Sequence, residues 1–137
     1  MKLVLCFIIA ALAIGLYYEA SKEPTNVVWV KLLTVANKMN RKLPQQQDRW
    51  IRADKIIVGP KKELTYFYTV VIDELDESAF KKIKSNLDYS YEYSSDMKYF
   101  RENNVAVHKV YLYEDSDKTV ILSTNSGKIT TTKSLNK

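Results

Sequence analysis

Glycine, proline and cysteine are scarce in this chain. Its 137 residues include three glycines, three prolines and one cysteine. So few chain breakers argue against disorder and against repeats, and they favour regular elements joined by short loops. The single cysteine, Cys6, lies in an apolar amino-terminal run, so no disulfide can form in the rest of the chain, which must be stabilised by its core alone.

Residues for metal or cofactor chemistry are equally scarce. His108 is the only histidine, and without a second histidine or a cysteine beyond the leader a zinc site is improbable. The acidic run Asp73–Glu77 lacks the glycine and the spacing of a calcium loop. Ser95-Asp96-Met97-Lys98 has the S-x-x-K spacing of penicillin-recognising enzymes, but the companion motifs are absent. The sequence therefore predicts no cofactor, no metal site and no identifiable catalytic residue.

A long run of one charge is also missing. The chain has 21 basic and 16 acidic residues, a net charge of +5 and a pI near 9.2. The basic residues are spread along the chain without an arginine-rich cluster, which argues against nucleic acid as a partner. Attraction to an anionic lipid or an acidic envelope polymer fits better, although a dispersed +5 is most often a solvated surface.

An uncharged apolar segment does stand out at the amino terminus. Residues 3–18 contain no charge and follow a single Lys2. The length of this segment is intermediate between that of the apolar centre of a signal peptide and that of a membrane-spanning helix. Cleavage after Ala13 or Ala20 would use a poor site, which favours retention. We therefore interpret residues 1–20 as a signal peptide or a transmembrane anchor, with the membrane as a partner through residues 3–18. The expected location is the bacterial inner membrane facing the periplasm, or the periplasm or medium if the leader is cleaved.

Residues 21–129 are expected to form one extracytoplasmic α+β domain, followed by a polar tail over 130–137. A helix should begin near Thr25 and end before Pro44, with a stripe formed by Val28, Leu32, Val35 and Met39. This stripe indicates a core helix, and the alternatives are a partner-binding helix or a stalk continuing the anchor. The order α-β-β-α-α-β-β predicts a four-stranded antiparallel sheet made of two hairpins, without a β-α-β unit and with helices on one face. The further segments expected are strands at 50–58, 64–73, 105–114 and 118–124, a helix ending near 86–88, an extended piece over 89–93 and a short helix stopped at 103–104.

Four tyrosines provide the best candidate for a binding surface. Tyr66 and Tyr68 share one face of their strand, and Tyr111 and Tyr113 share one face of theirs, because side chains alternate. If the two strands are neighbours, the four rings form a patch on the open face of the sheet. The opposite side chains, which would then face the helices, are Phe67, Val71, Val110 and Leu112. Tyrosine is enriched at binding surfaces, but such pairs can also serve only to stabilise a sheet.

A second candidate surrounds the start of the first strand. Asp48 and Arg49 precede it, and Arg52 and Asp54 share one of its faces. An arginine can form a forked contact with a carboxylate, within the chain or on a ligand, whereas a local salt bridge contributes little. Arg52 and Asp54 are therefore included in the binding hypothesis.

Three stretches together resemble a group of small exported or membrane-tethered bacterial proteins of uncharacterised function. The resemblance covers most of residues 36–113 and implies an extracytoplasmic bacterial address, without an active site to transfer. The matching residues are Asn40-Arg41-Lys42-Leu43-Pro44 with Asp48, Arg52 and Asp54; Leu64-Thr65-Tyr66-Phe67-Tyr68-Thr69; and Ser95-Asp96-Met97-Lys98 with Asn104, Val105 and Tyr111.

These observations favour a non-enzymatic binding protein, similar in size and address to inhibitor, immunity or exclusion proteins. Its partner would be an unknown protein or envelope component. The alternative is an envelope enzyme whose site combines Arg52, Asp54 and His108 with the tyrosines. The two differ in whether these polar groups meet in one pocket.

Overall fold

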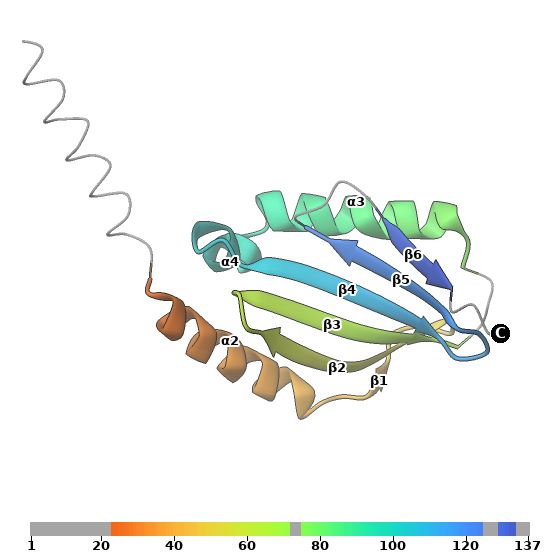
Figure 1. Cartoon of the computed structure of the whole chain (residues 1–137), viewed down its shortest axis with the longest axis horizontal. Coiled ribbons are helices and arrows are strands. Elements are labelled where there is room, and N and C mark those ends of the chain that lie inside the picture. Colours follow the sequence, from red (N-terminus) through yellow and green to blue (C-terminus); the bar gives the residue numbers. More distant parts are fainter. Residues whose placement is uncertain (1–22, 72–74, 125–128, 134–137) are drawn as a thin grey trace, which may run out of the picture.

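The computed structural model describes residues 23–71, 75–124 and 129–133 of the chain. They form an α+β domain in which helices pack on one face of a mixed sheet (Figure 1). The elements, in chain order, are α2 (Thr25–Asn40), β1 (Gln45–Gln46), β2 (Ile51–Gly59), β3 (Glu63–Val70), α3 (Glu77–Tyr93), η1 (Ser95–Met97), α4 (Lys98–Glu102), β4 (Ala106–Tyr113), β5 (Lys118–Ser123) and β6 (Thr130–Lys133).

The sheet has six strands in the order β1-β2-β3-β4-β5-β6. The two predicted hairpins, β2–β3 and β4–β5, are confirmed as antiparallel pairs. They meet through β3 and β4, which run parallel. The prediction of a four-stranded, wholly antiparallel sheet without a β-α-β unit was therefore wrong. The chain returns from the end of β3 to the start of β4 through α3, η1 and α4, and a crossover of this kind is what parallel neighbours require.

Both outer strands extend the sheet beyond the prediction. β1 pairs two residues with β2, and β6 pairs with β5 along Thr130–Thr132 and Lys133. The polar tail was expected to begin at Thr130, but threonine is β-branched and suits a half-exposed edge strand. The structure thus places residues 130–133 in the sheet.

α3 is longer than the sequence indicated, because it continues through Tyr89, Tyr91 and Tyr93. Alternation of tyrosine with polar residues favoured an extended piece there. On the helix, Tyr89 and Tyr93 lie one turn apart and exposed, with ring centroids 4.8 Å apart. Tyr91 points inward and donates a hydrogen bond to the Val105 carbonyl at 2.8 Å. Tyrosines at every second position occur in extended segments and in helices, so this spacing did not show which of the two forms here.

α2 begins at Thr25, as predicted, although Pro24 occupies the N-cap position. Its buried side is Val28, Leu32 and Ala36, so the expected core helix is confirmed, with the stripe shifted toward Ala36. Asn40, its last residue, attaches the helix to β2. The Asn40 amide donates to the Ile56 carbonyl at 2.8 Å and accepts from the Ile56 N–H at 2.7 Å. This side chain satisfies a stretch of β2 that β1 does not reach.

The two faces of the sheet are reversed relative to the prediction. Tyr111 contacts Phe80 of α3 edge-on, with ring centroids 5.2 Å apart, and is 2% exposed. Leu112 points the other way and is 42% exposed. The tyrosines therefore face the helices and their neighbours form the open face. Tyrosine can be buried against helices as readily as aliphatic residues when its hydroxyl has a polar outlet. The residues of the open face include Phe67, Thr69, His108, Val110, Leu112 and Ile121, whereas Val71 follows the end of β3.

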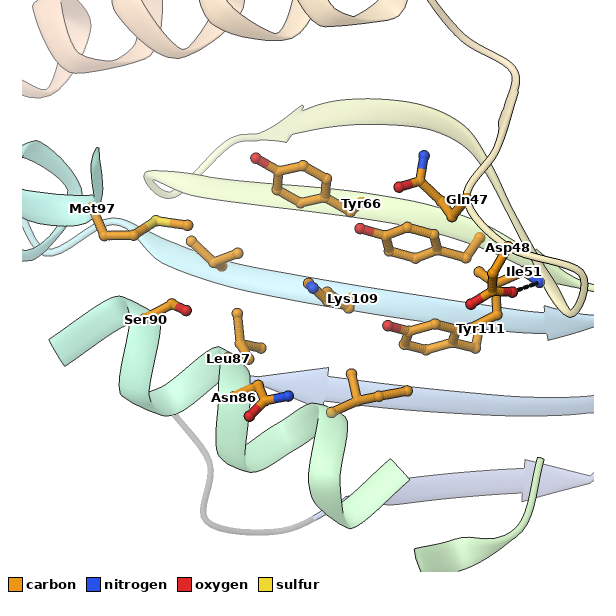
Figure 2. A pocket seen from close by; sticks show the side chains of 13 residues that line it. Gln47, Asp48, Ile51, Tyr66, Asn86, Leu87, Ser90, Met97, Lys109 and Tyr111 are labelled. Atoms are coloured by element: carbon orange, nitrogen blue, oxygen red, sulfur yellow. Dashed lines mark hydrogen bonds between the residues drawn. The ribbon is translucent and has the colours of Figure 1, made fainter. Parts of the chain in front are cut away.

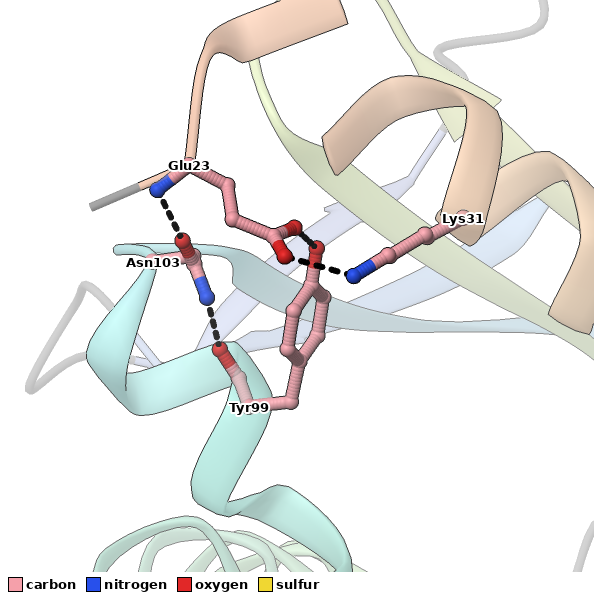
Figure 3. A network of polar contacts seen from close by, with 4 residues as sticks. All are labelled: Glu23, Lys31, Tyr99 and Asn103. Carbon is pink, nitrogen blue, oxygen red and sulfur yellow. Dashed lines mark hydrogen bonds and ion pairs between the residues drawn. The ribbon is translucent and has the colours of Figure 1, made fainter. Parts of the chain in front are cut away.

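A polar network joins the start of α2 to α4 (Figure 3). The Tyr99 hydroxyl and the Lys31 ammonium both donate to the Glu23 carboxylate, each at 2.6 Å. The Glu23 N–H donates to Asn103 Oδ1 at 3.2 Å, and Asn103 in turn donates to the Tyr99 carbonyl. The hydrogen bonds from Lys31 and Tyr99 lower the pKa of Glu23. The chain therefore enters the described domain beside α4.

Candidate functional site

A groove runs between α2 and α3, with strands β3 and β4 as its floor. One part of it, beside α3, is a cavity of about 470 Å³ (Figure 2). A second part, beside α2, has a volume of about 540 Å³ and shares Gln47, Tyr66 and Tyr68 with the first. Both volumes are typical of small-molecule sites. The remaining lining is Asp48, Ile51, Ile83, Asn86, Leu87, Ser90, Met97, Val107, Lys109 and Tyr111 in the first part, and Val35, Lys38, Met39, Lys42, Leu43, Gln45, Ala53 and Ile56 in the second.

Three tyrosine rings form the floor. The Tyr66 and Tyr68 centroids lie 6.5 Å apart with planes 11° from parallel, and those of Tyr68 and Tyr111 lie 4.9 Å apart at 13°. This order follows from the strands, because Tyr66 and Tyr68 are successive inward residues of β3 and Tyr68 pairs with Tyr111 on β4. Figure 2 shows the hydroxyls of Tyr66 and Tyr111 turned toward the end of the groove where Met97 lies.

The three hydroxyls are open to the groove. No residue in the described ranges forms a hydrogen bond with them, and the same residues contain no fully enclosed side-chain polar atom without a partner. Burial raises the pKa of Tyr68 to about 12 and also raises the pKa values of Tyr66 and Tyr111. All three phenols are therefore protonated at neutral pH and can donate hydrogen bonds to a ligand.

Lys109 lies on the floor among these rings. It pairs with Tyr66 across β3 and β4, and its ammonium is 5.7 Å from the Tyr68 ring centroid. Burial lowers the pKa of Lys109. No carboxylate of the described residues forms an ion pair with it. Lys109 is partly buried and has no anionic partner among the described residues, so this ammonium is available to an anion entering the groove.

Asp48 is the one carboxylate among the lining residues of the groove. Its Oδ1 accepts hydrogen bonds from the N–H groups of Trp50 and Ile51 at 2.7 and 2.8 Å. Asp48 therefore closes the turn into β2. The remaining polar lining near Lys109 includes Asn86 and Ser90 of α3, which are uncharged.

The candidate residues predicted from the sequence divide between the two faces. Tyr66, Tyr68 and Tyr111 come together in the groove, whereas Tyr113 is buried next to them and donates to the Leu75 carbonyl at 3.0 Å. Arg52 and Asp54 lie on the open face. Their side chains are joined at 2.7 Å, and Thr69 bonds to both. The ion pair with Asp54 raises the pKa of Arg52.

His108 also lies on the open face, 3.9 Å from Glu63. It pairs with Thr65, whereas Arg52 pairs with Thr69, so about 13 Å of strand separates the two at 3.3 Å per residue. The groups of the enzyme alternative, namely Arg52, Asp54, His108 and the tyrosines, do not meet in one pocket.

Lys109 is the main residue that sequence reasoning missed. It follows His108 directly in the sequence, and no motif marks it. The available signal was alternation: Val107, Lys109 and Tyr111 share one face, and a lysine between two buried residues must itself be directed inward. The groove walls on α3 could not be assigned, because their relation to the tyrosines depends on the parallel crossover.

Neither a metal centre nor a bilayer-crossing helix occurs in the part of the chain that the structure describes. Within 23–71, 75–124 and 129–133, histidine, cysteine and carboxylate side chains do not gather in threes. In those same ranges, every helix is too short or too polar to traverse a membrane. Residues 3–18, on which the anchor prediction rests, lie outside the described residues.

Comparison with known proteins identifies the fold but no family. No protein-family model matches the chain, and no curated protein is significantly similar to it. A solved structure of a candidate secreted protein from Pseudomonas aeruginosa has the same fold, with a TM-score of 0.58. The two are 12% identical, and the match covers 78% of this chain and 89% of that one. The chain is thus an α+β protein whose architecture occurs in at least one other protein.

Proposed function

We propose that this chain is an exported, non-enzymatic binding protein that holds its ligand in the groove between α2 and α3. The ligand would lie across Tyr66, Tyr68 and Tyr111, next to Lys109. This proposal retains the binding role expected for the tyrosines and moves it from the open face of the sheet to the helix-covered face.

The observation that carries the proposal is the row of stacked rings with unpaired hydroxyls beside an unpaired ammonium. Rings on the floor of a groove provide flat apolar area at little cost in side-chain entropy. Hydroxyls and an ammonium without partners in the described residues can form hydrogen bonds with a ligand that carries matching groups.

Export is supported by the apolar run over residues 3–18. The similarity to a candidate secreted protein agrees with this address. The resemblance carried by the motifs from Asn40 to Tyr111 points the same way. Either a retained anchor or a cleaved signal would place the domain outside the cytoplasm.

The location outside the cytoplasm is tested with two separate fusions, in which alkaline phosphatase or green fluorescent protein follows the carboxyl terminus. Export predicts an active phosphatase and a dark fluorescent fusion, because only the phosphatase matures outside the cytoplasm. Fractionation of the unfused chain then separates a retained anchor from a cleaved signal. A bright fluorescent fusion with an inactive phosphatase would contradict export.

The groove is tested by site-specific photocrosslinking in cells of the source organism. A benzophenone side chain replaces Ser90, which lines the groove, or Thr119, which lies on the open face opposite Leu112. The proposal predicts a ligand adduct of defined mass at position 90 and none at position 119. Adducts at position 119 alone, or at neither position, would contradict it.

A further inference from the structure

We infer that the ligand of the groove is a single-chain amphiphile with an anionic head group, held by Lys109 through its negative charge. This inference rests on the proposed binding function and names the class of ligand. Its head group would also accept hydrogen bonds from the tyrosine hydroxyls, and its alkyl chain would lie between the two helices.

The charges around the groove favour an anion. Lys109 lies on the floor, and Lys38 and Lys42 line the part beside α2. Asp48 is the only carboxylate of the lining, and it already accepts two backbone hydrogen bonds. Three cations against one engaged carboxylate give the groove a positive potential, which low-dielectric walls strengthen.

The position of Lys109 adds a specific partner to this general potential. Its ammonium has lost part of its hydration through burial, which lowers its pKa, and it gains only a distant ring contact with Tyr68 in return. An anionic head group would supply the missing counter-charge. The phenols of Tyr66 and Tyr111 flank the lysine (Figure 2) and can donate to the same head group.

The walls of the groove favour an alkyl chain. Leu87 and Met97 face the cavity from the α3 side, and Val35 and Met39 line it on α2. Val35 and Met39 are 39% and 40% exposed, so they present apolar surface that the domain itself leaves uncovered. Methionine adapts its shape to irregular apolar ligands. Covering these side chains would bury apolar area on both partners.

A peptide fits this groove less well than an amphiphile does. β3 and β4 form the floor, and each already pairs with a neighbour on both sides. An extended peptide binds most often by adding a strand to a free sheet edge. The floor strands β3 and β4 therefore have no free edge, so an extended peptide lying on them could not gain main-chain hydrogen bonds from them.

The test uses the full chain in phosphatidylcholine nanodiscs and a photoreactive analogue of dodecanoate. The matched neutral probe is the same analogue of 1-dodecanol. Peptide mapping locates the label, which separates the groove from the apolar leader. Unlabelled dodecanoate then competes with the probe, and the half-maximal concentration is measured for wild type, Lys109→Met and Lys109→Arg. Lys81→Met is the matched control, because Lys81 is an exposed lysine of α3 that pairs with Glu77.

We expect the carboxylate probe to label peptides from the segments 35–47 and 83–97. Lys109→Met should raise the half-maximal concentration of dodecanoate at least tenfold. Lys109→Arg should bring it most of the way back to the wild-type value, and Lys81→Met should change it by less than twofold. Equal labelling by the neutral probe, or an unchanged Lys109→Met, would overturn the inference of an anion and leave the groove as a binding site. Absence of groove labelling by both probes would overturn the amphiphile as ligand, whereas crosslinking at position 90 decides the groove function separately. Displacement by an acidic peptide but not by dodecanoate would assign the groove to a peptide.

Discussion

Tyr68 and Tyr111 lie opposite each other on the parallel strands β3 and β4, with ring centroids 4.9 Å apart and ring planes 13° from parallel. Their rings contribute to the core, and their hydroxyls face the groove between α2 and α3. The same pair thus serves packing and the candidate site. Variants must therefore distinguish the loss of a tyrosine ring from the loss of its hydroxyl group and from the loss of the Lys109 charge.

Loss of the Tyr111 ring should destabilise the domain strongly. Tyr111 is 2% exposed and packs against Phe80 and Tyr68. Tyr111→Ala should lower the free energy of unfolding by about 3–5 kcal/mol, as for other large-to-small core changes. Urea unfolding measures it. Tyr89→Ala, at a position that is 68% exposed, should cost less than about 0.5 kcal/mol, and equal losses at both positions would contradict the burial described.

Lys109→Met should leave the fold as stable as wild type or make it more stable. Burial disfavours the charged lysine in the folded state, and no carboxylate of the described residues compensates for it. Methionine has a similar length and removes that penalty, so the free energy of unfolding at pH 7 should rise by up to about 1 kcal/mol.

Lys84 provides the contrast to Lys109. It is buried on α3 but pairs with Asp88 at 2.5 Å. Lys84→Met removes this partner of Asp88 and should lower stability. If Lys109→Met destabilised the domain as much as Lys84→Met does, Lys109 would have a structural role and the proposed site would lose its support.

Stability should fall as the pH rises from 10 to 12. In the unfolded chain tyrosine has a pKa near 10, whereas burial raises the pKa of Tyr68 to about 12. Between these values the unfolded state has released the proton and the folded state still binds it, so the free energy of unfolding decreases with pH. The urea midpoint at pH 9 and pH 11 measures this decrease. Tyr68→Phe should make it smaller, and an equally large decrease in this variant would show that Tyr68 is not responsible.

Asn40 should be essential for holding α2 on the sheet. Its amide forms two hydrogen bonds with the backbone of Ile56, a residue that is 4% exposed. Asn40→Ala leaves both backbone groups unsatisfied and should cost about 2 kcal/mol or more. Urea unfolding gives the cost, and amide hydrogen exchange at Ile56 should accelerate. Lys38→Ala, at an exposed position on the same helix, is the control, and a loss as large there would contradict a specific role for the two Asn40 hydrogen bonds.

Local pattern predicted most of the elements. The aromatic and β-branched runs identified β2 to β5, and Asn103 with Asn104 marked the end of α4, where Asn104 adopts a φ of 54°. The positive φ at this residue matches the tolerance of asparagine for left-handed backbone. What failed was the pairing of the two hairpins, because a parallel contact between β3 and β4 is a long-range property that spacing does not encode.

Of the candidate site, the sequence predicted the tyrosines but neither Lys109 nor the face of the sheet on which they lie. Alternation grouped Tyr66 with Tyr68 and Tyr111 with Tyr113, which the structure confirms. The prediction of which face the helices cover was wrong, since Phe67 and Leu112 offered an equally apolar alternative. The hydroxyls of Tyr66 and Tyr68 open into the groove and so avoid the penalty for buried polar groups. The sequence alone could not show that these hydroxyls face a groove.

The ionisation of Lys109 decides whether the groove holds an anion. The groups around it are the phenols of Tyr66, Tyr68 and Tyr111, with Asp48 as the one lining carboxylate, and α3 contributes only uncharged side chains. A pH titration of the full chain with ¹³C-labelled lysine side chains, followed by NMR with and without dodecanoate, resolves it. We expect the pKa of Lys109 to lie below the ordinary value of 10.5 without ligand, and dodecanoate to raise this pKa. A Lys109 signal that titrates at the same pH in both samples would contradict the account.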